Sequence, residues 1–249
     1  MFPLRDDNPT LATPVVTYAI VALNVAAWLV LQGSGTEPSL THSVCSLGLI
    51  PGQLLGLTPD GFRVPLGPRT SCVLHHSGAS WLSPLSSMFL HGGWLHLLGN
   101  MWFLWIFGNN VEDSMGRARF SVFYLLCGLA AAAAQMAANP ASPVPMVGAS
   151  GAIGGVMGAY ASLYPRARVD MLIVLGFYVT RAAVPAVLVL GLWFVLQLVG
   201  GLPSVGAEGG GVAFWAHVGG FVGGLVMSYV FRNPLLVEAH RRATGGRLS

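Results

Sequence analysis

Residues 147–155 read VGASGAIGG, and they place a single serine, Ser150, among four glycines at the start of an apolar run that ends near Tyr164. Glycines let neighbouring backbones approach closely and leave the serine hydroxyl accessible. Taken alone, this pattern is typical of the small-residue packing face of a membrane helix, where serine is common. The remainder of the chain favours a chemical role for Ser150.

The composition predicts a polytopic membrane protein. Of the 249 residues, 54% are hydrophobic and only 8% are charged, whereas about a quarter of the residues of a typical soluble domain are charged. The mean hydropathy is +0.66. All twelve basic residues are arginines that form no dense run, which argues against nucleic-acid binding. Three cysteines are too few for a disulfide scaffold.

Six apolar segments are long enough to cross a membrane, because about 20 helical residues span the hydrocarbon core. These segments are residues 14–32, 94–111, 119–138, 148–164, 182–200 and 212–231. We therefore expect an all-α, polytopic, six-helix membrane domain over residues 14–231, preceded by a short segment, 1–13, and followed by a polar tail, 232–249.

Two stretches between these segments do not fit a transmembrane helix. Residues 33–93 form a long first loop rich in Gly, Pro and Ser, and a loop of this length is usually functional or flexible. Residues 171–179 are apolar, but Asp170 and Arg181 bound them and they are too short to cross as a helix.

The arginines predict the orientation of the helices. An even number of spans places both termini on one side of the membrane. If that side is the cytoplasm, ten arginines lie in inner segments, and only Arg63 and Arg69 lie in outer ones. Because cytoplasmic segments of membrane proteins are enriched in basic residues, we expect both termini in the cytoplasm.

Four polar residues lie at similar depth in the outer halves of these predicted spans. His96 and Asn100 are one helical turn apart on the second span, Ser150 opens the fourth, and His217 lies near the start of the sixth. For each residue alone, packing or an interhelical hydrogen bond is the simpler explanation. Their common depth indicates one shared site, because independent packing residues would be scattered between the two leaflets.

These residue types suit nucleophilic catalysis. A serine hydroxyl needs an adjacent base, and a neutral histidine such as His217 can take its proton and return it to a leaving amine. His96, Asn100 and the backbone N–H of Ser150 can donate to an oxyanion. Because no carboxylate lies in the outer half of a span, we expect a Ser–His dyad; Glu208, in an outer loop, is the weaker alternative for orienting His217.

At these positions the chain resembles the rhomboid intramembrane serine proteases. The resemblance consists of His91, His96 and Asn100 around the second span, GASG at 148–151, and AHVGG at 216–220. The order of these motifs is similar to that of the basic six-span bacterial form. The resemblance therefore implies an integral protein of the bacterial cytoplasmic membrane.

The resemblance also implies a role for each matching residue. Ser150 would be the nucleophile and His217 the general base; His96, Asn100 and the Ser150 amide would form the oxyanion hole, and His91 would support the first loop. The implied activity is endopeptidase cleavage of transmembrane-helix substrates in or near the outer leaflet, without a cofactor or a metal. The implied partners are single-span or polytopic membrane proteins and the lipid bilayer. The fifth span and the loop after it would form a substrate gate and cap.

Some features leave alternatives open. Gly154 occupies a position where some relatives carry a tyrosine beneath the base, so the residue that packs against His217 stays open. A catalytically inactive rhomboid-like protein that binds membrane clients is the first alternative. A small transporter is the second, although no carboxylate pathway crosses the spans. A zinc protease is not predicted, because the sequence contains no His-Glu-x-x-His.

The cysteines of the first loop lead to a separate expectation. Cys45 and Cys72 would lie outside the cytoplasm, where many bacterial compartments are oxidising, so we expect them to form a disulfide. Two free thiols, or a metal site made of Cys72, His75 and His76, are the alternatives. Cys127 lies within the third span and is too distant to take part.

Overall fold

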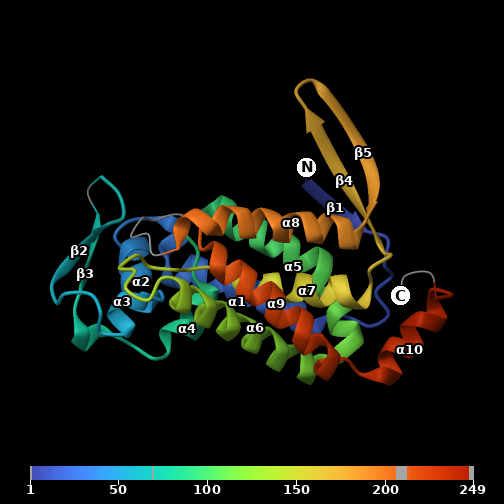
Figure 1. Cartoon of the computed structure of the whole chain (residues 1–249), viewed down its shortest axis with the longest axis horizontal. Helices are drawn as coiled ribbons and strands as arrows, with labels where there is room; N and C mark the ends of the chain where they lie inside the picture. Colours follow the sequence, from blue (N-terminus) through green and yellow to red (C-terminus); the bar gives the residue numbers. More distant parts are fainter. Residues whose placement is uncertain (1, 69, 206–211, 247–249) are drawn as a thin grey trace.

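The computed structural model of the chain describes residues 2–68, 70–205 and 212–246. Its body is a bundle of long helices that run side by side (Figure 1). One of them lies on each predicted span: α1 (Val15–Ala26, extended by a π-helical turn, Ala27–Leu31), α5 (Trp94–Met115), α6 (Arg117–Ala138), α7 (Ser150–Leu163), α8 (Ala186–Gly201) and α9 (Phe214–Phe231). The predicted helical membrane bundle is confirmed.

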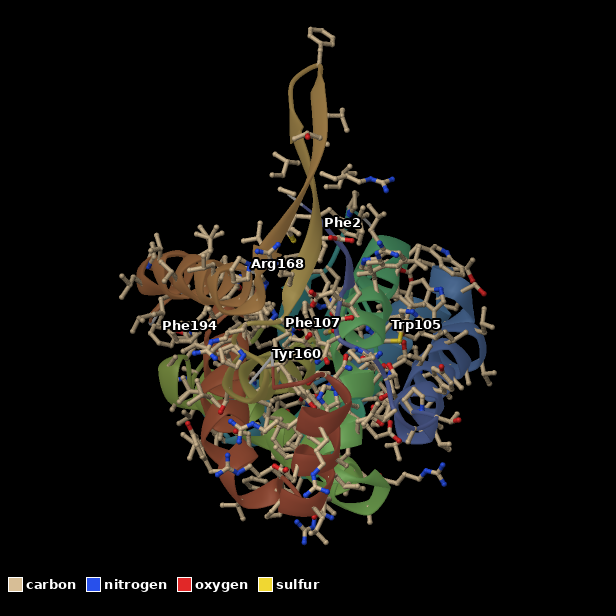
Figure 2. All side chains as sticks on the ribbon, turned by 90° about the vertical axis from the view of Figure 1, so that its right-hand side faces the viewer. Phe2, Trp105, Phe107, Tyr160, Arg168 and Phe194 are labelled. Atoms are coloured by element: carbon tan, nitrogen blue, oxygen red, sulfur yellow. A yellow bond between two sulfur atoms is a disulfide. The ribbon has the colours of Figure 1, made fainter. Side chains whose placement is uncertain are left out.

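The helices of the bundle differ in length and in how apolar they are. Among the described residues, α6, α9 and the stretch Ala186–Ser204, which begins with α8, are long and apolar enough to cross a membrane, and Val15–Leu31 is apolar but shorter. The 14 residues of α7 rise only about 21 Å. The buried interior of the bundle surrounds α7, and Figure 2 shows Phe107 and Tyr160 at its centre, with their rings 5.0 Å apart.

Helices α7 and α9 pack backbone against backbone. A Cβ atom added to Gly220 would overlap the carbonyl oxygen of Gly151, and one added to Gly224 would overlap that of Gly155. Small residues at a membrane helix interface permit this close approach and allow extensive van der Waals packing. The glycines around Ser150 and His217 therefore determine the distance between the two helices that carry these residues.

Two carboxylates at the end of α5 hold the N-terminal segment. The Glu112 carboxylate accepts hydrogen bonds from the Val16 N–H (3.0 Å) and from the N–H and hydroxyl of Thr17 (both 2.8 Å), and Asp113 accepts from the Leu11 and Ala12 N–H groups. The first N–H groups of a helix have no intrahelical partner, so the buried Glu112 supplies the missing acceptor for α1.

A three-stranded antiparallel sheet, in the order β1-β4-β5, lies at the same end of the bundle. It contains β1 (Phe2–Asp6), β4 (Arg168–Leu175) and β5 (Tyr178–Pro185). As expected, residues 171–179 do not form a transmembrane helix: the apolar residues on either side of Gly176 pair across a tight hairpin, and Gly176 adopts a φ of +60° without strain. Because β5 extends to Pro185, the fifth helix begins at Ala186 and not at residue 182.

Polar contacts fasten this sheet to the bundle. The Tyr160 hydroxyl donates to a carboxylate oxygen of Asp6 at 2.5 Å, and the Arg5 guanidinium pairs with Asp170 at 2.9 Å. Burial raises the pKa of the Asp6 carboxyl from its ordinary value to about 7.

At the C-terminal end, His240 of α10 (Pro234–Ala243) contacts the Pro9 carbonyl oxygen at 3.2 Å. The N- and C-terminal segments therefore lie at one end of the bundle, which we call the α10 end.

The first loop is a folded unit. It contains α2 (Ser39–Leu47), α3 (Pro51–Leu54), the hairpin β2 (Phe62–Pro65) and β3 (Ser71–Leu74), and α4 (Ser83–Ser86). The predicted disulfide between Cys45 and Cys72 is confirmed, with the Cα atoms 5.5 Å apart. It joins α2 to β3, and both sulfurs pack beside a small apolar cluster around Ile50.

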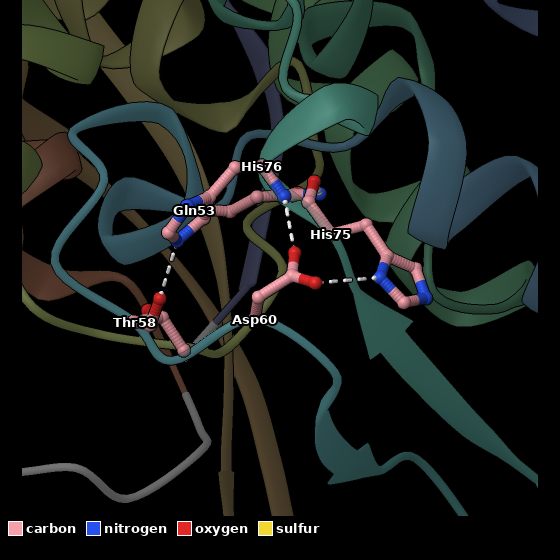
Figure 3. Close-up of polar contacts among 5 residues, drawn as sticks. All are labelled: Gln53, Thr58, Asp60, His75 and His76. Atoms are coloured by element: carbon pink, nitrogen blue, oxygen red, sulfur yellow. Dashed lines mark hydrogen bonds and ion pairs between the residues drawn. The ribbon is translucent and has the colours of Figure 1, made fainter.

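His75 and His76 of this loop are bonded to other residues of the loop (Figure 3). Asp60 accepts from the His76 N–H at 2.9 Å and contacts the His75 ring at 3.4 Å, while the His76 ring contacts the Thr58 carbonyl oxygen at 2.7 Å. The His76 N–H and the His75 ring hold the pKa of the exposed Asp60 below its ordinary value. Since Cys72 is in the disulfide, the alternative metal site with His75 and His76 is not formed.

We predict that Cys45 and Cys72 resist alkylation until they are reduced. In the unfolded but unreduced protein, a thiol reagent should label only Cys127, and reduction should expose all three cysteines. Replacing both disulfide cysteines with serine should lower the free energy of unfolding by about 3 kcal/mol, because a loop of this length then regains its entropy in the unfolded chain. Labelling of three thiols before reduction would contradict the disulfide.

We also predict that Gly220→Ala destabilises the bundle by about 1–3 kcal/mol, because the new methyl group must separate α9 from α7. Gly191→Ala on α8 is the matched control, since an added Cβ there meets no atom within 4 Å. Thermal unfolding in detergent micelles measures both variants. Equal melting temperatures for the two would show that the helices do not depend on this contact.

Candidate active site

The structure brings Ser150 and His217 into direct contact. The hydroxyl oxygen of Ser150, the first residue of α7, lies 2.8 Å from Nε2 of His217, in the first turn of α9. The Gln135 side chain on α6 accepts a hydrogen bond from the Ala216 N–H at 3.3 Å and so holds the start of α9. Two residues 67 positions apart in the sequence thus form the predicted pair.

The other ring nitrogen of His217 is also held. Nδ1 lies 2.8 Å from the Oε1 oxygen of Gln197 on α8. A carbonyl oxygen can only accept, so Nδ1 carries the proton, and Nε2 is left with the lone pair that receives the Ser150 hydroxyl proton. The Gln197 side chain therefore fixes the tautomer that a general base requires.

Sequence analysis did not identify Gln197. In the apolar stretch 182–200, only Gln197 and Trp193 have side chains that can form hydrogen bonds. Polar residues in membrane spans are functional candidates, so this signal could have identified Gln197. Its place opposite His217 depends on the packing of α8. The weaker alternative, Glu208, lies outside the described residues.

An aromatic ring replaces the tyrosine that some relatives carry. The Trp193 ring of α8 packs against the His217 ring with a centroid distance of 5.7 Å. A Cβ added to Gly154 would lie 3.2 Å from the His217 carbonyl oxygen and 3.6 Å from the Trp193 ring. The space that a side chain would occupy at Gly154 is thus taken by α9 and by Trp193, which packs against His217 instead.

His96 and Asn100 face the same space from α5. The Gly92 N–H donates to Nδ1 of His96 at 3.3 Å, so a neutral His96 carries its proton on Nε2. That nitrogen lies beside Gly148, whose φ of +132° suits glycine. The amide nitrogen of the buried Asn100 has no hydrogen-bond partner among the described residues. Two side-chain donors are therefore available near Ser150.

His91 lies behind His96 and is completely buried. Its ring meets the His96 ring edge to face at 5.1 Å, and the Gln32 side-chain amide bonds both the N–H (2.8 Å) and the carbonyl oxygen (2.7 Å) of the His91 backbone. Burial lowers the pKa of the His91 imidazole to about 3, so this ring is neutral at physiological pH. His91 thus packs against His96 and is held through its backbone by Gln32, and its role in supporting the first loop stays a prediction.

A cavity of about 530 Å³ opens onto these groups. Ser150, His217, His96 and Asn100 all line it, as does Trp193, and its other walls are mostly apolar. A volume of this size holds several side chains of a peptide. Among the described residues, no group of three or more His, Cys, Asp or Glu side chains could hold a metal ion.

The sequence was compared with known proteins. The family model described as Rhomboid domain matches residues 78–234. The chain is 36% identical over 61 residues to Rhomboid-like protein 11, chloroplastic, of Arabidopsis thaliana, which covers 24% of this chain and 22% of that protein. It is 31% identical over 121 residues to Inactive RHOMBOID-like protein 8 of the same plant, which covers 44% of this chain and 33% of that protein.

The match to the family model contains the residues that line the site, including Ser150 and His217. It covers more than half of the chain and runs from the end of the first loop through α9. The chain spans a third or less of the length of the two plant relatives. The helical bundle and the matched domain together identify the chain as a membrane protein of the rhomboid family.

Proposed function

We propose that this protein is an intramembrane serine endopeptidase that cleaves transmembrane-helix substrates through a Ser150–His217 dyad. The observation that carries the proposal is the 2.8 Å contact between the Ser150 hydroxyl and Nε2 of His217, at a cavity with free donors. One plant relative is named as inactive, but an inactive protein that binds membrane clients, the alternative, has no need of an aligned nucleophile and base.

The geometry supports the usual two-stage acyl transfer. Ser150 Oγ attacks the scissile carbonyl carbon while His217 Nε2 takes the hydroxyl proton. The protonated His217 then gives this proton to the nitrogen of the leaving amine, and the peptide C–N bond breaks. Water attacks the resulting acyl-serine, again losing a proton to Nε2, and the carboxylic acid product leaves as the serine regains its proton.

The oxyanion that forms in each stage has three candidate donors. They are Nε2–H of His96, the side-chain amide of Asn100, and the backbone N–H of Ser150, which has no intrahelical partner because Ser150 opens α7. Donors fixed in place before the reaction stabilise the developing charge without reorganising. The helix dipole at the start of α7 favours the same negative charge.

The arginine distribution supports placing the α10 end on the cytoplasmic side, with the Ser150 end toward the outer leaflet. Contact between the N- and C-terminal segments is consistent with an even number of membrane crossings. Partners would then be single-span or polytopic membrane proteins whose helices reach the cavity from the outer leaflet.

A fluorophosphonate probe should label Ser150, because the probe requires a serine activated by a neighbouring base. Ser150→Ala and His217→Ala should each abolish labelling and cleavage of a membrane substrate, and the double variant should be no worse, since the pair acts as a unit. Ser162→Ala, on the same helix, is the matched control and should behave as the parent chain. Labelling that persists in Ser150→Ala, or a parent chain that is never labelled, would refute the protease.

Asn100→Ala should lower kcat by roughly 10²–10³-fold with little change in KM, which is the typical effect of losing one oxyanion donor. Asn109→Ala on the same helix is the control, because Asn109 bonds Thr10 at the far end of α5 and should leave kcat unchanged. A rise in KM alone would instead make Asn100 a substrate-binding or packing residue.

Gln197→Leu should lower kcat about tenfold without changing KM, because loss of a neutral hydrogen bond to His217 costs about 1–1.5 kcal/mol. Gln197→Glu keeps an acceptor oxygen and should restore most of the rate. Nitrogen NMR of the His217 ring reports the tautomer directly and should change only in the leucine variant. If both variants match the parent in rate and tautomer, Gln197 does not position the base.

A further inference from the structure

The apolar segment between Asp170 and Arg181 has no part in the site described above. Residues 171–180 read MLIVLGFYVT and contain no charged side chain. They form the distal part of the β4–β5 hairpin, in which Leu172 pairs with Arg181 and Val174 with Val179. Strand β1 pairs with β4 only as far as Leu172. Beyond that point no further strand lies beside the hairpin in the part of the chain that the structure describes.

Three residues around the turn are exposed, whereas residues near the base are buried. Val169 and Met171 belong to the buried core, whereas Val174 is 52%, Val179 59% and Phe177 fully exposed. Figure 2 shows the distal part of the hairpin extending away from the bundle. Val174 and Val179 are directly paired and so lie on one face, next to the turn that carries Phe177.

The direction of the hairpin relates it to the membrane. In Figure 1 it stands across the axes of α8 and the neighbouring helices, at the α10 end of the bundle. Helices of this bundle cross the bilayer, so an element across their axes runs along the membrane surface. Strand β5 leads directly into α8, whose first exposed side chains, Val187 and Leu188, are apolar. The hairpin therefore continues the lipid-facing surface of α8.

The charges at the base of the hairpin suit the surface of a membrane. Arg168 and Arg181 are exposed, and the only acidic residue of the hairpin, Asp170, is paired with Arg5. Basic side chains near a bilayer attract anionic headgroups, each by about 1 kcal/mol. An apolar tip flanked by arginines is the pattern of segments that lie in the membrane interface.

We propose that the β4–β5 hairpin is a lipid-binding finger, whose tip, residues 174–179, enters the membrane interface at the α10 end, with Arg168 and Arg181 at the phosphates of anionic lipids. The depth is limited to the interface, because the unpaired backbone edges of a two-stranded hairpin need water or headgroups as hydrogen-bond partners. The finger holds the end of α8, the helix that carries Gln197 and Trp193. The lipid contact itself does not depend on the proposed catalysis.

The test uses the full chain in vesicles of zwitterionic and anionic phospholipids, with a nitroxide attached to Phe177→Cys. Cys45 and Cys72 are bonded and Cys127 is buried, so the introduced thiol takes the label. Two positions calibrate depth: Val195→Cys on the exposed face of α8, and Glu238→Cys on α10. Power saturation compares access of dissolved oxygen, which concentrates in lipid, with that of a water-soluble nickel complex.

We expect the oxygen-to-nickel ratio at residue 177 to be several-fold higher than at residue 238 and nearer to that at residue 195. A ratio at residue 177 equal to that at residue 238 would overturn the proposal. So would spin–spin broadening that disappears when unlabelled protein is added, because the tip would then bind a second copy.

A second arm tests the arginines. Omitting the anionic lipid, or introducing Arg168→Gln and Arg181→Gln together, should lower the ratio at residue 177, whereas Arg63→Gln in the first loop should not. An unchanged ratio in both cases would overturn the assignment of the arginines to lipid phosphates. None of these measurements requires activity, so they can also be made in Ser150→Ala, and their failure is distinct from failure of the protease proposal.

Discussion

The direct backbone contact between α7 and α9 is the constraint on which the site depends. Ser150 and His217 each lie at the start of one of these helices, and glycines at 151, 155, 220 and 224 let the two backbones touch. The 2.8 Å contact between the serine hydroxyl and the imidazole follows from this spacing. One methyl group in the interface would separate the helices by more than a hydrogen bond tolerates. The glycine-rich sequence around the serine thus serves packing and chemistry together.

Around this contact, neutral hydrogen bonds rather than charges set the state of each imidazole. A side-chain carbonyl oxygen directs the proton of His217 to Nδ1, and a backbone N–H directs that of His96 to Nε2. One ring is thereby prepared to accept a proton and the other to donate a hydrogen bond. The acceptor at His217 is the neutral amide of Gln197, so the imidazole is oriented without a second charged group in the span.

Carboxyl groups at the α10 end hold the beginning of the chain. Glu112 and Asp113 bind backbone N–H groups at the beginning of the chain, and Asp6 binds the hydroxyl of Tyr160. These bonds tie the N-terminal strand and α1 to the central helices. The β4–β5 hairpin lies at the same end, and its second strand, β5, leads directly into α8. One end of the bundle is therefore stabilised by polar contacts, and the other holds the cavity with Ser150 and His217.

The sequence by itself determined the helical membrane bundle, because runs of uncharged apolar residues have no other stable arrangement in a bilayer. It also indicated Ser150, His217, His96 and Asn100, since polar residues are costly in lipid and these share one depth, and the resemblance then assigned them roles. Tertiary structure alone decided the partners of His217, because Gln197 and Trp193 reach it only through the packing of α8. It also decided the sheet: β1 and β4 are more than 160 residues apart, and their pairing leaves no periodic signal in so short a segment.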